Sequence, residues 1–310
     1  MIQDIEPHQF HIEYFHYYPR REDTVLVCRG QSVLLKQNGR GMISFPKVEN
    51  FPEGEMRFRY LFRIDEERFF LGIPSLGKQA EEIQKWVDFE TGEEHCDFGQ
   101  DFPVPSGYRF ENIRIFRGGR PVDRAFAGMV GCRLAQWYEE SRFCGHCGVP
   151  MVHDEKERMM RCPKCGRTRY PVICPAVIVA VVHNGKLLMS RYAGRSYKNY
   201  ALIAGFAETG ETIEQTVHRE VMEEVGLPVR NLHFYKSQPW AFTGTLLMGF
   251  FCELDGSDET ITLEEDELSE AGWFTPEQVP EDEEHCSLTA EMMEVFRRGE
   301  HRRYLSGQSL

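Results

Sequence analysis

The sequence has little of what an exported or membrane-bound protein carries. Its opening, MIQDIEPHQF, has neither the basic start nor the apolar core of a signal peptide. No apolar run approaches the roughly 18 residues that a membrane-spanning helix requires. We therefore expect a cytoplasmic protein without a membrane partner.

Positive charge is scarce relative to negative charge. The 310 residues include 36 Lys and Arg against 49 Asp and Glu, a formal net charge of −13. This balance disfavours a broad electrostatic grip on long nucleic acid, which requires a basic surface. It leaves open a pocket that binds one end of an RNA. Hydrophobic residues make up 41% of the chain, which is enough for two or three compact units.

Cysteine is well represented, with ten residues, and four of them have metal-ligand spacing. Cys144 and Cys147 form one Cys-x-x-Cys pair, and Cys162 and Cys165 form another after fourteen residues. Two such pairs indicate a tetrahedral zinc site. Because four thiolates leave no open position, we expect one structural Zn²⁺ per chain. The alternative, two disulfides, is disfavoured in a chain without an export signal.

The stretch Gly205–Leu227 has the clearest local pattern in the chain. Thr212, with Gln215 three positions later, makes a capping box, which predicts a helix that begins near Ile213. Gly226 is a normal helix end, because glycine readily adopts the left-handed conformation found there.

Inside this helix, Glu220, Glu223 and Glu224 lie at positions i, i+3 and i+4, so they share one stripe. Most Glu-rich helix faces are solvated, yet like charges at this spacing repel by roughly 0.2–0.5 kcal/mol per pair. Clustered carboxylates are also the hard oxygen ligands that Mg²⁺ or Mn²⁺ requires. The residue types alone do not separate a solvated face from a metal site.

The spacing of the whole stretch is more specific. Nine specified positions fall across 23 residues: Gly205, Glu211, Arg219, Glu220, Val221, Glu223, Glu224, Gly226 and Leu227. The pattern resembles a complete Nudix box. The resemblance implies an α/β fold, the Nudix α/β/α sandwich with a mixed sheet. It also implies that the box glutamates bind divalent cations and activate water to cut a diphosphate, and that Arg219 holds Glu211 in a structural ion pair.

Hydrophobic patterns predict the elements around the box. The first 121 residues indicate a small strand-rich domain, with strands in Thr24–Leu35 and Met56–Ile64 and a helix near Gln79–Val87. Further on, we expect a helix over Val122–Arg142, strands over Ala176–Val182, Lys186–Arg191, Leu232–Ser237, Thr245–Glu253 and Ala271–Phe274, and a helix over Leu288–Arg298. The predicted domains are an N-terminal domain (1–121), a connecting helix (122–143), a zinc ribbon (144–171) and a Nudix hydrolase domain (172–310).

Two features around the box narrow the resemblance. A zinc ribbon directly precedes it, and a Ser-Gln-Pro-Trp segment with a second aromatic follows it. Together they resemble the NudC-type NADH pyrophosphatases. That subfamily implies hydrolysis of NAD(H) to nicotinamide mononucleotide and AMP, removal of NAD caps from the 5′ end of RNA, and a homodimer. The alternatives are a hydrolase for ADP-ribose or another nucleoside diphosphate derivative, and a nucleotide-sensing module without catalysis.

The resemblance also implies roles for individual residues. Glu220, Glu223 and Glu224 match the catalytic glutamates. The implied Mg²⁺ or Mn²⁺ ligands are Ala204, through its carbonyl, with Glu220, Glu223, Glu224 and Glu267. The implied substrate-binding residues are Glu157, Tyr170, Phe206, Ser237, Gln238, Pro239, Trp240, Ala241, Phe242, Thr243, Gly244 and Ala290. Ala241 and Thr243 replace two prolines of the subfamily signature, and Thr245 replaces its last serine, so we expect a less rigid loop.

Overall fold

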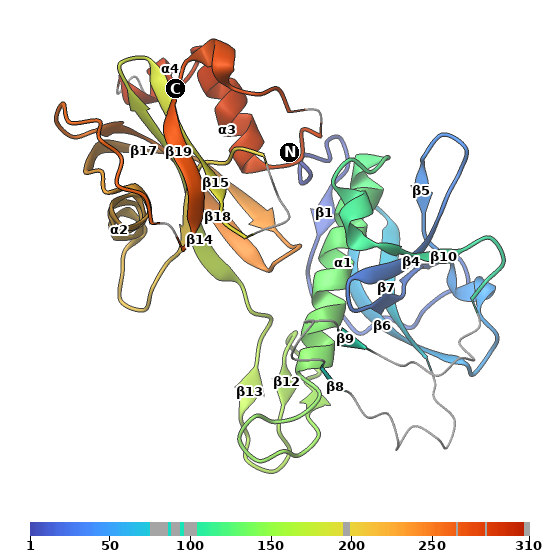
Figure 1. The fold of residues 1–310 in the computed structure, drawn as a ribbon. Coiled ribbons are helices and arrows are strands. Elements are labelled where there is room, and N and C mark those ends of the chain that lie inside the picture. The colour runs from blue at the N-terminus through green and yellow to red at the C-terminus, as the bar shows by residue number, and fades with distance from the viewer. Residues whose placement is uncertain are drawn as a thin grey trace. The chain divides into compact units, whose positions relative to one another are not determined.

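The computed structural model describes residues 1–74, 86–87, 94–95, 104–194, 199–264, 266–282 and 284–306, and the statements below concern these residues. The chain forms two compact units (Figure 1). One contains residues 2–172, and the other contains residues 173–310 together with Met1. Within the described residues, no helix is long and apolar enough to cross a membrane.

The first unit is rich in short strands. Its sheets have the orders β1-β6-β7-β2 and β10-β4-β3, with β5 beside β4 and a separate β8–β9 pair. The strands are β1 (Phe10–His11), β2 (Thr24–Leu26), β3 (Cys28–Arg29), β4 (Ser32–Gln37), β5 (Ile43–Ser44), β6 (Met56–Ile64), β7 (Glu67–Pro74), β8 (Trp86–Val87), β9 (Glu94–His95) and β10 (Arg109–Asn112).

Two predictions for this unit need correction. The expected strand region Thr24–Leu35 is divided into β2, β3 and the beginning of β4, because Gly30 turns the chain with a φ of 49°. The helix predicted near Gln79–Val87 lies outside the described residues except at its end. There, Trp86–Val87 pairs with β9 as a strand, so the prediction is wrong for those two residues. The strand over Met56–Ile64 is confirmed.

Helix α1 (Val122–Glu140) packs closely against this unit. A Cβ atom on Gly128 would lie 2.1 Å from the ring of Phe116, and one on Gly131 would lie 2.0 Å from Leu26. These glycines therefore allow helix and core to approach. Two short 3-10 helices, η1 (Val48–Asn50) and η3 (Ile113–Phe116), complete this part of the unit.

The cysteine pairs lie in the segments before β11 and between β12 and β13 of a three-stranded sheet at the end of the first unit. Its strands, in the order β11-β12-β13, are β11 (Val152–His153), β12 (Met160–Arg161) and β13 (Thr168–Arg169). The sheet is too small to bury a core of its own. Metal binding is the usual source of folding free energy for such a module.

The second unit is built on a six-stranded mixed sheet. Its main path is β17-β18-β14-β15-β19, and β16 also pairs with β14. Strands β14 and β18 are parallel, and the other pairs are antiparallel. The strands are β14 (Cys174–His183), β15 (Lys186–Tyr192), β16 (Ile203–Phe206), β17 (Val229–Trp240), β18 (Thr245–Leu254) and β19 (Leu268–Phe274).

Helices cover both faces of this sheet (Figure 1). Strand β14 is buried on both sides and alternates its side chains between two cores. One core receives Val217, Val221 and Val225 of α2 (Ile213–Val225), and the other receives Leu288 and Met292 of α3 (Leu288–Arg297). Short segments η4 (Pro276–Gln278) and α4 (Arg302–Leu305) complete the unit. The predicted α/β/α sandwich with a mixed sheet is confirmed.

Most sequence patterns in this unit gave the correct element. Asn184 and Gly185 both have positive φ, at 48° and 73°, as the two-residue hairpin turn between β14 and β15 requires. The strand predicted to end at Ser237 instead continues to Trp240. Pro239 is tolerated there because β17 is an edge strand, where a missing backbone donor breaks no ladder on the outer side.

Candidate active site

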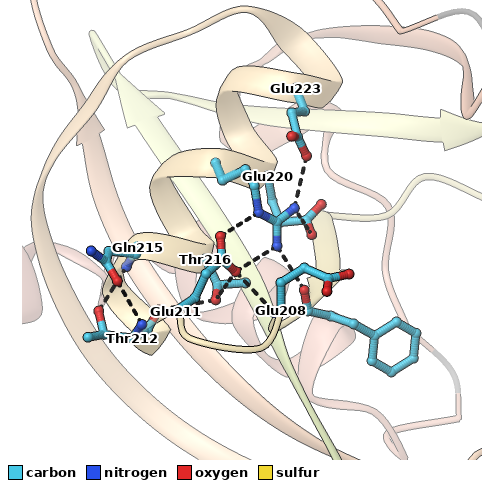
Figure 2. Close-up of polar contacts among 9 residues, drawn as sticks. Glu208, Glu211, Thr212, Gln215, Thr216, Glu220 and Glu223 are labelled. Carbon is cyan, nitrogen blue, oxygen red and sulfur yellow. Dashed lines mark hydrogen bonds and ion pairs between the residues drawn. The ribbon is translucent and has the colours of Figure 1, made fainter.

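The helix that carries the box glutamates is fixed at both ends by its own sequence. Thr212 Oγ1 accepts a hydrogen bond from the Gln215 amide at 3.2 Å, and Gln215 Oε1 accepts one from the Thr212 amide at 2.8 Å. Gly226 ends the helix in the left-handed conformation, with a φ of 70°. The predicted start, capping box and end are therefore confirmed (Figure 2).

Packing of α2 on the sheet separates the three glutamates. The fully buried valines of α2 draw its neighbouring face against β14. As a result Glu220 and Glu224 are only 8% and 2% exposed. The side chain of Glu223 stays 59% exposed. A stripe that is uniform in the sequence therefore contains two buried carboxylates and one that faces solvent.

Arg219 forms ion pairs with three carboxylates, those of Glu211, Glu220 and Glu223, which are labelled in Figure 2. Its Nε and Nη2 donate to the two oxygens of Glu211 at 2.6 and 2.9 Å. Its Nη1 donates to Glu220 at 2.7 Å and to Glu223 at 2.9 Å. The hydrogen bond from Arg219 is the main reason that the pKa of Glu211 falls to about 2. The expected Arg219–Glu211 ion pair is present, and the two further contacts were not foreseen.

Glu220 lies directly against the backbone of β16. A Cβ atom on Gly205 would come 1.9 Å from Glu220 Cδ, so only glycine leaves room for the carboxylate. Gly205 follows Ala204, whose carbonyl is one of the expected metal ligands. Burial raises the pKa of Glu220, and the charges of Glu223 and Glu267 act in the same direction, against the hydrogen bond from Arg219.

The acidic segment after β18 is attached to the end of α2. The amides of Thr262 and Glu264 donate to the carbonyls of Val225 and Glu224, each at 3.0 Å. This attachment brings Glu267 close enough for its charge to affect Glu220.

These residues offer the chemistry of a hard-cation site. Carboxylate and carbonyl oxygens are the ligands that Mg²⁺ and Mn²⁺ prefer. Because Gly205 has no side chain, the carboxylate of Glu220 fits against it, next in sequence to Ala204, whose carbonyl is a candidate ligand. In the structure Glu220 and Glu223 point to Arg219 rather than to one common centre (Figure 2). The donor set fits a divalent cation, and Arg219 competes with that cation for two of the carboxylates.

The four knuckle cysteines do converge. Their sulfur atoms all lie within 4.8 Å of one another, the only such group of potential metal ligands among the residues described. Backbone amides also point at the sulfurs, and those of Cys165 and Lys164 help to lower the pKa of Cys162 to about 6. Against hydrogen bonds from backbone amides, burial and hydrogen bonds from the neighbouring sulfurs raise the pKa values of Cys147 and Cys165. The convergence of four sulfurs is the geometry that a tetrahedral Zn²⁺ site requires. The predicted structural zinc site is thus supported by geometry.

The remaining predicted site residues are distributed over both units. In the first unit Tyr170 is half-exposed, and its hydroxyl donates to Glu157 at 2.5 Å. In the second unit Phe206 is exposed at the end of β16, and Ala290 lies in the first turn of α3. The rings of Trp240 and Phe242 lie 4.9 Å apart in a tilted arrangement.

Within the Ser-Gln-Pro-Trp segment, Gln238 differs from the residues beside it. It is fully buried, and its Nε2 donates to the Cys286 carbonyl at 2.9 Å while its Oε1 accepts from the Leu288 amide at 2.7 Å. Gln238 therefore fixes the start of α3. Ser237, Pro239 and Thr243 are exposed, Ala241 is half-buried and Gly244 is buried in the turn before β18.

Thr216 is a residue that sequence reasoning missed. It is fully buried, and its hydroxyl contacts Glu211 Oε2 at 3.0 Å and the Thr212 carbonyl at 3.1 Å. It therefore helps Arg219 to hold Glu211. Its position one turn after the helix cap, on the side of the buried valines, was the available signal.

Comparison with known proteins identifies a Nudix domain and a zinc ribbon in this chain. Residues 173–296 match the family described as NUDIX domain, and residues 139–170 match the NADH pyrophosphatase zinc ribbon domain. A relative in Chromobacterium violaceum, named NAD-capped RNA hydrolase NudC, is 39% identical over 60% of this chain and 69% of its own length. The chain belongs to the Nudix hydrolase family. A relative of the same name in Pectobacterium atrosepticum is 41% identical over 49% of this chain and 57% of its own length.

Part of this chain is also similar to a solved structure. A NUDIX hydrolase from Nitrosomonas europaea has a TM-score of 0.43 and 22% identity, and the match covers 52% of this chain and 93% of that one. The alignments to curated relatives span between just over half and about two thirds of the relatives' lengths.

Proposed function

We propose that this Nudix hydrolase cuts the pyrophosphate bond of NAD(H) to give nicotinamide mononucleotide and AMP. We propose that it cuts the same bond in the NAD cap at the 5′ end of RNA, which releases nicotinamide mononucleotide and leaves the adenosine monophosphate on the RNA. The observation that carries the proposal is the intact box, in which Glu220 and Glu224 are buried and Glu220 lies against Gly205 of β16. The zinc ribbon and the names of the similar proteins support NAD as the substrate class.

The chain's own residues suggest how the reaction is organised. Glu220, Glu223, Glu224, Glu267 and the carbonyl of Ala204 would hold Mg²⁺ or Mn²⁺, which supplies the positive charge that neutralises the pyrophosphate and acidifies water. One carboxylate then accepts a proton from the water as its oxygen attacks phosphorus, and the other phosphate leaves. Glu223 and Glu224 are the two candidates for this base.

Aromatic residues are the main candidates for positioning the substrate. Trp240 and Phe242 offer aromatic faces, and Phe206 and Tyr170 are exposed aromatics that could stack on a base or on nicotinamide. Glu157, Ala290 and the segment from Ser237 to Gly244 complete the proposed set. The four-part domain division, a homodimer and a cytoplasmic location belong to the same proposal.

Release of AMP from NADH in the presence of Mn²⁺ tests the proposal. We expect Glu224→Gln to keep the fold and to lower turnover by roughly a hundredfold or more, the usual scale of general acid–base contributions. Glu223→Gln, measured alongside, separates the two candidate bases. Turnover of Glu224→Gln close to that of the unaltered protein would contradict the assignment.

Substrate preference needs a second comparison. Ala241 and Thr243 lie where the subfamily signature has prolines, so the loop is expected to be less rigid and its substrate preference to differ. The rival substrate is ADP-ribose or another nucleoside diphosphate derivative. NADH, NAD⁺, ADP-ribose and NAD-capped RNA should be compared at one metal concentration. A preference for ADP-ribose would move the chain to another branch of the family, and no hydrolysis of any of them would indicate a nucleotide sensor.

A further inference from the structure

The loop between β11 and β12 carries Glu157 and is tightly folded. The carboxylate of Asp154 accepts from the amides of Lys156 and Glu157 at 2.9 and 3.1 Å. The amide of Met159 donates to the Glu157 carbonyl at 2.8 Å. These bonds fix the backbone on both sides of Glu157.

Both ends of this loop are also attached to the segment that follows β1 or to β6 of the same unit. Arg158 Nη2 donates to the carbonyl of Ile12 at 3.1 Å and to that of Leu61 in β6. The hydroxyl of Tyr14 donates to the Asp154 carbonyl at 3.2 Å, and its ring lies 5.5 Å from the Arg158 guanidinium. The attachments therefore flank Glu157 on either side.

The environment of Arg158 is unusual for an arginine. Burial lowers its pKa, and no carboxylate of the described residues forms an ion pair with it. Its partners are the carbonyls of Ile12 and of Leu61 in β6, together with the ring of Tyr14. Because the guanidinium is planar and its donor directions are fixed, it holds the loop in one position relative to these carbonyls.

We propose that Arg158, assisted by Tyr14, is a positioning residue that holds Glu157 against Tyr170 for substrate binding. This gives residues of the N-terminal region a role in holding the loop that carries Glu157. The proposal rests on the proposed function for the identity of the substrate. The contact that Arg158 would maintain is the 2.5 Å hydrogen bond from the Tyr170 hydroxyl to Glu157.

Steady-state kinetics with NADH and Mn²⁺ tests this role. For Arg158→Lys we expect KM to rise about tenfold with kcat within about twofold, because lysine cannot donate from the same planar geometry. Tyr14→Phe removes a single hydroxyl and should raise KM about threefold. An unchanged KM in a folded Arg158→Lys protein would overturn the proposal.

A double substitution separates positioning from a general structural effect. If Arg158 acts through Glu157, Arg158→Lys should add little to the KM of Glu157→Gln. Full multiplication of the two effects would contradict the proposal. Arg68→Lys is the matched control, since Arg68 is a buried arginine of the same unit that pairs with Asp23 instead. It should leave KM unchanged.

Hydrogen exchange supplies a readout that needs no substrate. In Arg158→Lys, deuterium uptake should increase in residues 154–159 and stay constant in the knuckle at residues 162–167, where the Cys162 amide donates to the Arg167 carbonyl. Unchanged uptake in residues 154–159 would refute the positioning role. If the unaltered protein releases no AMP from NADH, the proposed function fails, and this arm still decides the role of Arg158.

Discussion

Arg219 and Arg158 each hold a segment that carries candidate site residues, but their surroundings differ. Arg219 contacts three carboxylates, and its hydrogen bonds with Glu211 in particular raise its pKa. Arg158 contacts two backbone carbonyls and an aromatic ring, and burial lowers its pKa. The first arginine is stabilised by its counter-charges, whereas the second keeps its charge in surroundings that disfavour it.

The two arginines should therefore have different effects on the reaction. Without Arg219, Glu211, Glu220 and Glu223 would repel one another where the metal is expected to bind. Without Arg158, two carbonyls lose a donor and the loop before β12 becomes looser, but no charge is left uncompensated. We expect the loss of Arg219 to act mainly on turnover and the loss of Arg158 to act mainly on KM.

The largest expected effect is that of Arg219→Lys. Lysine has one charged nitrogen and cannot contact three carboxylates in the same geometry, so turnover of NADH should fall by roughly a hundredfold or more. Initial rates with saturating Mn²⁺ measure this, and circular dichroism checks the fold. A loss of turnover no greater than that of Arg158→Lys would contradict the expectation that Arg219 acts mainly on turnover and Arg158 mainly on KM.

The motif around Arg219 could be read from the sequence because its geometry is local. Helix spacing, the capping box and the terminal glycine depend on residues within one 23-residue stretch. They correctly predicted the limits of α2. The ion pair between Arg219 and Glu211 was implied by the resemblance to the Nudix box, and it is present. Spacing alone could not show that Glu223 faces solvent while Glu220 is buried, because burial depends on how β14 and β16 pack against the helix.

The role of Arg158 could not be predicted in this way. Its partners, Ile12 and Leu61, lie 146 and 97 residues away along the chain. They contribute backbone carbonyls, which have no sequence signature. The same reasoning applies to Gln238, whose contacts with Cys286 and Leu288 span 48 and 50 residues. Long-range contacts to the backbone are the part of the site that only a structure reveals.

An intermediate effect is expected from Gly205→Ala, which alters the surroundings of Glu220, a partner of Arg219, without removing the arginine. The added Cβ would displace the carboxylate of Glu220, so turnover should fall roughly tenfold to a hundredfold. Gly118→Ala is the control, because its Cβ would meet nothing within 4 Å. Hydrogen exchange in residues 154–159 should not change. A Gly205→Ala protein with full turnover would remove Glu220 from the site.

The smallest expected effect tests whether the stability of the first unit, which contains Arg158, can be separated from the positioning of Glu157. Glu67 contacts Arg124, Thr24 and, at 3.0 Å, Lys47. Burial alone would raise its pKa, but hydrogen bonds from Arg124 and Thr24, with the charges of Arg124 and Lys47, lower it to about 2. The carboxylate therefore stabilises the fold above its ordinary pKa of 4.5, and this stabilisation disappears as the pH falls towards 2.

Glu67→Gln should accordingly lower the free energy of unfolding by roughly 1–3 kcal/mol at pH 7. Urea denaturation at pH 7, 5, 4 and 3 should show the gap to the unaltered protein narrowing below pH 4.5. Glu66→Gln, at an exposed neighbour, should change stability by less than about 0.5 kcal/mol. Because Glu67 does not contact the loop at residues 154–159, its substitution should leave KM for NADH unchanged. A rise in KM that matches that of Arg158→Lys would show that the Arg158 effect reflects stability of the unit rather than the placement of Glu157.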